Sequence, residues 1–281
     1  MFAIVMTIFC STSIALLLKY NDTRVGQPLV LLTGNYLIAS IISLIFLIEQ
    51  GKSVFSFDTF MFGVIVAIIF TASFFIFAKA VAVSGTALAQ TSSRLSVALP
   101  VLFSMIIFKE SPTNMQISGI FLAFITIFLF YVSVHKNSKE DDHGLTKYLY
   151  LVLLFIGIGL GDFSMKIFQG MRPMTEKPFF LFIIFTYSFF ICITILLIKK
   201  IPVLRPTLYL GMFLGVPNVF SSYFILSALT LYPAVVVYPF INIGIIVLTS
   251  VLAYLIWKEK LGFWGILSLS TGVLAIILLS R

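Results

Sequence analysis

Long apolar stretches separated by short polar segments make up nearly the whole chain. A bilayer core of roughly 30 Å requires about 20 apolar residues per helix, so we interpret these stretches as membrane helices. The apolar runs are continuous rather than alternating, which excludes a porin-like barrel. We expect ten spans, at residues 2–18, 28–48, 59–82, 86–108, 113–134, 146–168, 178–198, 207–230, 233–257 and 261–280.

Composition supports this interpretation. Of the 281 residues, 60% are hydrophobic and only 10% are charged, and the mean hydropathy is +1.15. A soluble protein could not keep that much apolar surface away from water, so lipid must solvate most of the molecule. The short loops leave no room for a catalytic domain outside the membrane. We therefore predict an all-α, multi-pass protein of the plasma membrane, specifically of a bacterial inner membrane.

The chain divides into two halves at a polar segment, residues 135–145, whose sequence HKNSKEDDHGL has no helical periodicity. The first half, residues 1–134, and the second half, residues 146–281, each contain five of the expected spans. Because five is odd, a second copy of a five-helix unit inserts in the opposite orientation, an arrangement typical of secondary transporters. We therefore predict two inverted five-helix repeats.

Matching residues in the two halves support a duplication. Residues 108–110, with the sequence Phe-Lys-Glu, correspond to residues 257–259, with the sequence Trp-Lys-Glu, at an offset of 149 positions. Each half also has a tight turn expected between its third and fourth spans, at residues 84–85 and 232–233, where Gly and Pro favour a reversal.

These features resemble the drug/metabolite transporter superfamily, specifically its EamA-like branch. The spaced glycines of that family's final helix match Gly265 and Gly272, and the proline of its fourth helix matches Pro100 or Pro239. The Trp-Gly pair of the family's first helix is replaced by Ser-Thr-Ser at residues 11–13. The resemblance covers essentially the whole chain. It implies gradient-driven transport of a small metabolite through a cavity between the halves, and cytoplasmic termini.

Four ionisable residues lie within the expected spans, where a central charge costs about 2.5–3.5 kcal/mol on insertion scales. Arg94 is the deepest of them, about eight residues from the nearer end of its span, in a polar stretch that begins at Gln90. We expect its guanidinium to face a wet cavity and to hold an anionic or carboxylate-bearing substrate. The alternative is a structural ion pair, or a hydrogen bond to broken backbone near Pro100.

Asp162 and Lys166 lie four residues apart in the sixth span, so they share one helix face and can form an ion pair. Asp162 is also a candidate proton site for coupling transport to a proton gradient. A third interpretation is a gate in which Asp162 pairs with Arg94 across the two halves. Lys79 lies near the end of its span, where snorkelling to the interface explains it.

The charges within the spans favour an anionic or zwitterionic substrate, such as an organic anion or an amino acid. Three positive residues and one negative residue give these positions a net charge of +2. Uncharged polar residues in the spans are further candidates for the substrate site, or alternatively for hydrogen bonds between helices. They are Asn35, Tyr36, Gln90, Asn218, Tyr238 and Asn242.

The sequence contains no motif of an enzyme, metal site or cofactor site. Both histidines, His135 and His143, lie in the polar segment, and no Walker-type glycine loop for ATP hydrolysis occurs. Cys10 and Cys192 lie in separate apolar stretches, as packing residues do. The net charge of +8 is scattered through short loops, so the expected partners are lipid headgroups rather than nucleic acid.

Two patterns conflict on orientation. The loops on the side of the termini carry five Lys and Arg residues and those on the opposite side carry ten, so the positive-inside rule places the termini outside. The family resemblance implies the reverse.

We therefore expect a secondary transporter, a monomer or a homodimer in the lipid bilayer, that moves a small metabolite by alternating access. The competing interpretation is a non-transporting membrane receptor or scaffold, which would bind a small ligand without flux. An intramembrane enzyme ranks third, because no catalytic constellation is visible.

Overall fold

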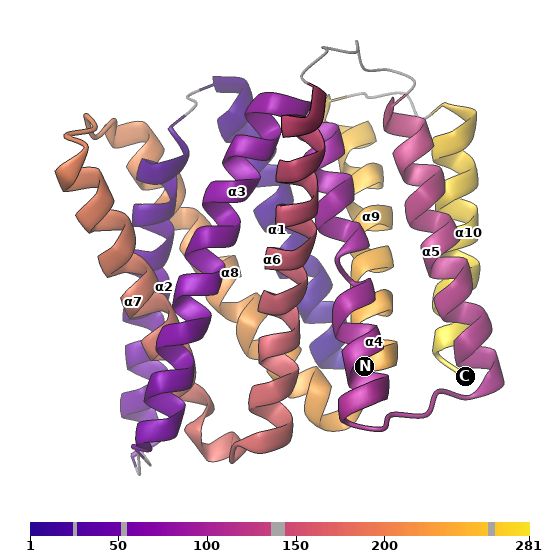
Figure 1. Ribbon diagram of the computed structural model, residues 1–281, viewed down its shortest axis with the longest axis horizontal. Helices are drawn as coiled ribbons and strands as arrows, with labels where there is room; N and C mark the ends of the chain where they lie inside the picture. The colour runs from indigo at the N-terminus through magenta and orange to yellow at the C-terminus, as the bar shows by residue number, and fades with distance from the viewer. Residues whose placement is uncertain (25–26, 52–54, 136–143, 258–261) are drawn as a thin grey trace.

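The computed structural model describes residues 1–24, 27–51, 55–135, 144–257 and 262–281 (Figure 1). Within these residues the regular elements are all helices, which stand side by side. The helices are α1 (Phe2–Arg24), α2 (Pro28–Glu49), α3 (Phe57–Leu95), α4 (Ala98–Ile107), α5 (Asn114–His135), α6 (Gly144–Met171), the short η1 (Met174–Glu176), α7 (Lys177–Ile198), α8 (Arg205–Leu231), α9 (Ala234–Trp257) and α10 (Phe263–Leu279).

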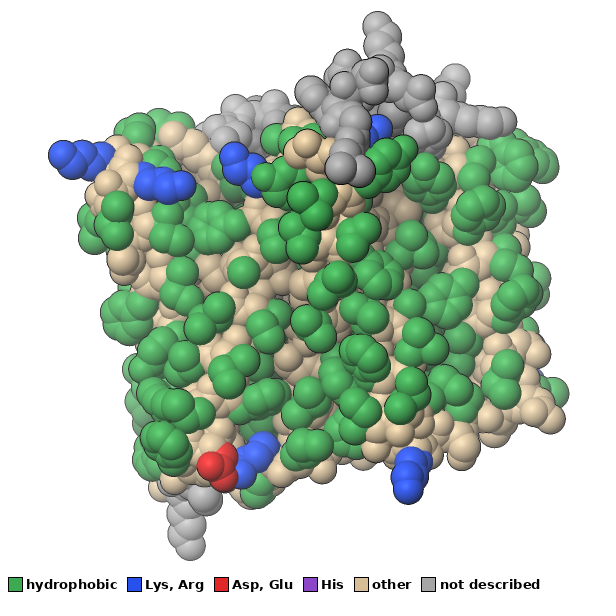
Figure 2. Space-filling model, viewed as in Figure 1, with side chains coloured by type: hydrophobic (Ala, Val, Ile, Leu, Met, Phe, Trp, Pro, Cys, Tyr) green, Lys and Arg blue, Asp and Glu red, His purple; other side chains and the backbone are tan. Residues whose placement is uncertain are grey.

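We name the two ends of the bundle by the view in Figure 1. The upper face is the end where α6 begins and α7 ends. The lower face is the end where α2 and α6 end, and both termini of the chain lie toward it. Hydrophobic side chains cover the visible surface between the two faces, and the visible Lys and Arg side chains lie near the two ends (Figure 2). This is the distribution expected for a protein that is surrounded by lipid at mid-height.

Eight helical segments of the described residues are long and apolar enough to cross a bilayer. They are Pro28–Glu49, Phe57–Gly85, Leu88–Ile107, Asn114–Val132, Thr146–Met171, Met174–Ile198, Arg205–Leu231 and Ala234–Ile256. Phe2–Leu18 and Phe263–Leu279 are shorter apolar helices. Each of these segments lies at one of the expected spans. The polar segment that was expected to separate the halves lies largely outside the described residues, which omit 136–143.

The expected tight turns are present in both halves. In the first half Gly85 interrupts α3 with φ 80° and ψ 156°, a conformation that glycine adopts without steric cost. In the second half α8 and α9 are separated only by Tyr232 and Pro233.

The fourth span is present as the apolar pattern predicts, from Leu88 to Ile107, but its helical hydrogen bonding is interrupted beside Pro100. Two residues separate the end of α3 from the start of α4. Pro100 lacks the N–H that would bond the carbonyl oxygen of Ser96, and the Leu99 N–H bonds this oxygen instead, at 3.0 Å. The break therefore lies directly after the turn that carries Arg94.

Glycines allow α2 and α8 to pack with their backbones in close contact. A Cβ atom at Gly215 would lie 2.5 Å from the carbonyl oxygen of Asn35, closer than side-chain atoms can approach. Small residues serve this purpose between membrane helices. A hydrogen bond of 3.1 Å from Asn218 Nδ2 to Asn35 Oδ1 joins the same two helices.

We expect Gly215→Leu to lower the melting temperature of the purified protein. Overpacking a tight contact costs about 1–3 kcal/mol, and here the obstacle is backbone, which cannot rotate away. Val216→Leu is the matched control, because Val216 is the next residue on α8 and is exposed. Equal melting temperatures for the two variants, measured by thermal unfolding in detergent, would contradict the close contact.

Candidate functional site

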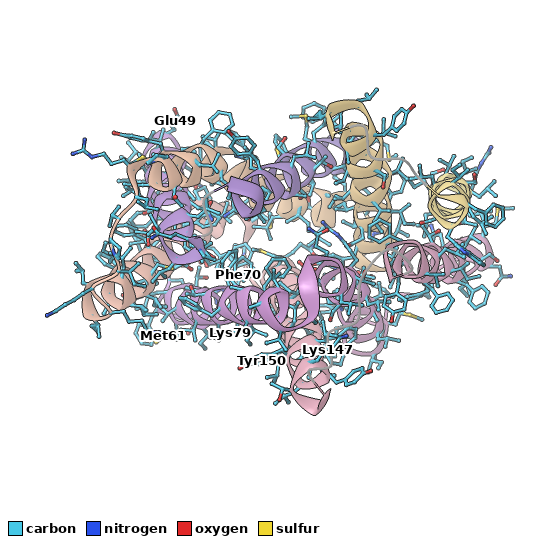
Figure 3. All side chains as sticks on the ribbon, turned by 90° about the horizontal axis from the view of Figure 1, so that it is seen from above. Glu49, Met61, Phe70, Lys79, Lys147 and Tyr150 are labelled. Atoms are coloured by element: carbon cyan, nitrogen blue, oxygen red, sulfur yellow. The ribbon has the colours of Figure 1, made fainter. Side chains whose placement is uncertain are left out.

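A cavity of about 310 Å³ lies among α1, α2, α3 and α6. Its lining residues fall between the middle of these helices and their upper ends. The polar lining includes Ser11, Tyr36, Ser73, Gln90, Ser93, Arg94 and Asp162, and the aromatic lining includes Phe70, Phe74 and Phe77. In the view from above, Phe70 lies toward the middle of the molecule, whereas Lys79 and Tyr150 lie at its outer edge (Figure 3).

Arg94 reaches the cavity from the last turn of α3, just before the break in the fourth span. The ion pairs formed among the described residues join other side chains, so the Arg94 guanidinium keeps its hydrogen-bond donors available to the cavity. This is the arrangement needed to bind a carboxylate or another anion.

Asp162 lies across the same cavity, on α6. Its carboxylate and the Arg94 guanidinium interact electrostatically across the cavity. The ion pairs of the described residues do not include a direct Arg94–Asp162 pair. The backbone carbonyl of Asp162 accepts a hydrogen bond of 2.5 Å from the Tyr238 hydroxyl, and Asn242 Nδ2 donates to the Tyr238 carbonyl at 3.1 Å. Tyr238 therefore connects α9 to the part of α6 that carries the acid, whereas the Asn242 hydrogen bond lies within α9.

Lys166 lies outside this cavity and has a different partner from the one its spacing predicts. Its Nζ pairs with Glu110 Oε1 at 2.9 Å and donates to Gln169 Oε1 at 2.8 Å. Lys166 therefore forms its ion pair with Glu110 and not, as its spacing predicts, with Asp162. Glu110 comes from the turn after α4, in the other half of the chain.

Glu110 joins the two halves of the chain near the lower face. Its second oxygen, Oε2, accepts a hydrogen bond of 3.0 Å from the Val235 N–H in the first turn of α9, where a carboxylate is favoured. The side chains of Glu110 and Lys166 are only 12% and 8% exposed. One buried carboxylate thus connects the turn of the first half to both α6 and α9.

Lys177 makes a second contact at this face, between α7 and α8. Its Nζ donates to Ser227 Oγ at 2.6 Å and lies 3.2 Å from the centre of the Tyr223 ring, a cation–π contact. The sequence pattern counted Lys177 as a loop cation, but the residue is buried in the first turn of α7.

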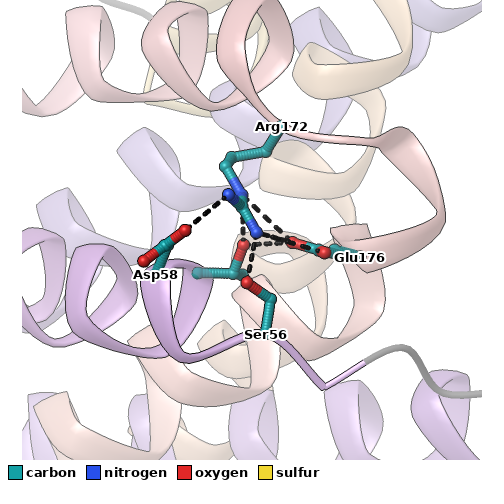
Figure 4. A network of polar contacts seen from close by, with 5 residues as sticks. Ser56, Asp58, Arg172 and Glu176 are labelled. Carbon is teal, nitrogen blue, oxygen red and sulfur yellow. Dashed lines mark hydrogen bonds and ion pairs between the residues drawn. The ribbon is translucent and has the colours of Figure 1, made fainter.

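Arg172 holds a third group of contacts at the lower face (Figure 4). It pairs with Asp58 at 3.1 Å and with Glu176 at 3.0 Å, and it donates to Thr59 Oγ1 at 2.8 Å. The group also includes hydrogen bonds from Arg172 to Ser56 and from Thr59 to Glu176. These contacts connect the start of α3 to the end of α6 and to η1.

A family model of EamA-like transporters matches residues 1–132. The chain belongs to the EamA-like transporter family. This family is part of the drug/metabolite transporter superfamily, whose members are membrane transporters rather than enzymes, so the protein is a membrane protein with several spanning helices.

Two further similarities accompany the family match. An uncharacterized protein of Haemophilus influenzae (strain ATCC 51907 / DSM 11121 / KW20 / Rd) is 30% identical over 200 residues, which are 69% of this chain and 67% of the relative. The crystal structure of another protein matches with a TM-score of 0.79 at 14% identity, covering 99% of this chain and 94% of the other. That likeness shows the fold alone.

The other site candidates of this EamA-like protein fall into three groups. Tyr36 and Gln90 line the cavity with Arg94 and Asp162. Asn35 and Asn218 bond each other between α2 and α8. Lys79 is exposed on the outer side of α3.

Sequence reasoning overlooked several contributors to the site. Ser11 and Ser73 resemble ordinary packing residues of membrane helices, so only the fold identifies them as cavity residues. In the sequence, Glu110 stands out only as part of a repeated motif, and its partners lie in the other half of the chain.

Proposed function

We propose that this EamA-like protein is a gradient-driven transporter of a small zwitterionic or anionic metabolite, and that it works by alternating access. One observation carries the proposal: Arg94 and Asp162 line a single cavity in the upper half of the bundle, while buried polar contacts close the lower face. We infer from these contacts a molecule that is closed at the lower face and accessible from the upper face. Its bacterial relative supports a place in a bacterial inner membrane.

Helix contacts support two inverted repeats, residues 1–134 and 146–281, with ten crossings. In this repeat α1 corresponds to α6, α2 to α7, α3 to α8, α4 to α9 and α5 to α10, and each helix can be exchanged for its equivalent. The α2–α7 and α5–α10 contacts then map onto themselves. The α1–α8 contact maps onto α6–α3, α1–α9 onto α6–α4, and α2–α8 onto α7–α3, and all of these contacts are present. This exchange is expected when two copies are related by an axis in the membrane plane.

The lining of the cavity favours a zwitterionic amino acid over an organic anion. Arg94 can bind a carboxylate through two parallel hydrogen bonds, and Asp162 can bind an ammonium group. Phe70, Phe74 and Phe77 offer an apolar surface for a side chain. An organic anion would satisfy Arg94 but leave Asp162 without a counter-charge. It would fit better if Asp162 were protonated, which is how this residue would couple transport to protons.

The test is counterflow into proteoliposomes that contain the purified protein. Vesicles loaded with an unlabelled apolar amino acid should accumulate the same labelled compound, whereas dicarboxylates and simple amines should exchange more slowly. A pH gradient applied in the same vesicles tests the role of Asp162. Saturable binding without flux for every compound would contradict the proposal and indicate a receptor.

A further inference from the structure

A second hollow, of about 360 Å³, lies on the outside of the bundle between the end of α5, the start of α6 and the part of α3 that follows Gly85. Its polar lining includes Tyr131, Lys147 and Tyr148, and its apolar lining includes Leu95, Val152 and Phe155. Tyr148 and Val152 are 65% and 54% exposed, so this groove faces outward. It is distinct from the substrate cavity.

The polarity of the groove changes with depth in the membrane. Lys147 and Tyr148 lie close to the start of α6 at the upper face, and Tyr131 lies near the end of α5 at the same face. Phe155 follows Lys147 by two turns of α6, which places it about 12 Å deeper at 1.5 Å per residue. The groove therefore carries its lysine and both tyrosines at its upper end and is mostly apolar below, where Thr91 and Ser92 are the polar lining residues.

We propose that this groove binds one anionic phospholipid from the surrounding bilayer. The phosphate contacts Lys147 and the two tyrosine hydroxyls, and an acyl chain lies along Val152 and Phe155. Tyrosine and lysine side chains are suited to the headgroup level, where lysine attracts anionic lipids. The positive end of the α6 helix dipole points to the same place. A free phosphate would leave the apolar trough empty, whereas a phospholipid fills both parts.

The bound lipid also contacts the helix segment that presents Arg94. One wall of the groove is formed by one side of the helical segment 88–95. The opposite side of the same segment carries Gln90 and Arg94, which line the substrate cavity. Ser92 Oγ donates to the Leu151 carbonyl at 2.6 Å and fixes this wall to α6. Lipid binding therefore stabilises the broken fourth span. The proposal does not depend on the transport assignment, because its test measures lipid binding.

Native mass spectrometry of the purified full chain tests the site, with phosphatidylglycerol and phosphatidylcholine of identical acyl chains offered in equal amounts. We expect one retained phosphatidylglycerol per protein. Lys147→Gln should weaken its retention about fivefold, the value of one lysine near an anionic headgroup. Lys199→Gln is the matched control, because Lys199 is an exposed lysine at the same face and lies outside the groove.

A second variant tests the apolar trough separately from the charge. Val152→Trp should reduce retention of both lipids while leaving the melting temperature in lipid-free detergent unchanged. Inorganic phosphate alone should not raise the melting temperature of the wild-type protein, whereas phosphatidylglycerol should. Equal losses in Lys147→Gln and Lys199→Gln would overturn the proposal, as would equal retention of the two lipids by the wild-type protein.

Discussion

Replacing Arg94 with alanine should reduce substrate uptake about a hundredfold at substrate concentrations below KM. Truncating one member of a buried, hydrogen-bonded charge pair costs about 2–5 kcal/mol, and here the substrate carboxylate would lose its counter-charge. The structure gives Arg94 this role because it lines the cavity and the ion pairs of the described residues do not involve it. Initial rates in proteoliposomes measure the effect.

Two companion variants make the Arg94 result specific. Arg94→Lys keeps the charge but loses the planar, two-pronged hydrogen bond, so its uptake should fall between those of the wild type and Arg94→Ala. Arg205→Ala removes an exposed arginine at the start of α8 and should leave uptake within about twofold of the wild type. Uptake by Arg94→Ala at the wild-type rate, in protein with a normal melting temperature, would remove Arg94 from the substrate site.

Glu110→Gln should shift the protein toward a conformation open at the lower face. The substitution removes the carboxylate from a buried ion pair and leaves Lys166 without its counter-charge, at a cost of about 3–5 kcal/mol to the closed state. Because 1.4 kcal/mol changes an equilibrium tenfold, the labelling rate of a cysteine at Ser227 by a polar reagent should rise more than tenfold. Labelling from the side of the lower face measures this shift.

The contribution of the Glu110–Lys166 contact can be isolated with a double variant. Glu110→Gln combined with Lys166→Met removes both charges, and replacing a whole buried pair with uncharged groups is often nearly neutral. Slow labelling should therefore return. Glu49→Gln changes an exposed carboxylate at the end of α2 and should have no effect. Slow labelling in Glu110→Gln itself would show that the pair does not hold the lower face closed.

The sequence predicted the features that depend on local pattern. Apolar length located the helices, and the cost of a buried charge singled out Arg94 and Asp162, which the fold brings to one cavity. The tight turns at Gly85 and at Pro233, just before Ala234, could also be predicted from residue type, because glycine and proline favour such reversals.

The features that depend on tertiary packing could not be predicted in the same way. The spacing of Asp162 and Lys166 indicated an intrahelical pair, but Glu110 reaches Lys166 from a distant turn and adds the Val235 N–H. Lys177 appeared to be a solvated loop residue, and only the packing of α7 on α8 buries it. Such partners cannot be identified until the relative positions of the helices are known.

The proposed repeat would relate the Lys177 contact to an equivalent pair in the first half. Lys177 and Gln27 each precede the first proline of a second helix, at an offset of 150, and Ser227 corresponds to Lys79 at an offset of 148. Lys177 donates a hydrogen bond to Ser227 at the lower face. At the upper face, Gln27 Oε1 is buried without a hydrogen-bond partner among the described residues, and Lys79 is exposed. Inverted copies exchange conformations, so we expect Lys79 to contact Gln27 when the upper face closes.

Disulfide cross-linking of these two pairs in membranes tests alternating access by the inverted repeats most directly. The background protein has Cys10→Ser and Cys192→Ala, and the pairs are Lys177→Cys with Ser227→Cys and Gln27→Cys with Lys79→Cys. If the two halves alternate, oxidant should cross-link both pairs, each disulfide should stop transport, and a reductant should restore it. Cross-linking of the Lys177–Ser227 pair alone, with the Gln27–Lys79 pair unreactive during turnover, would contradict this alternation.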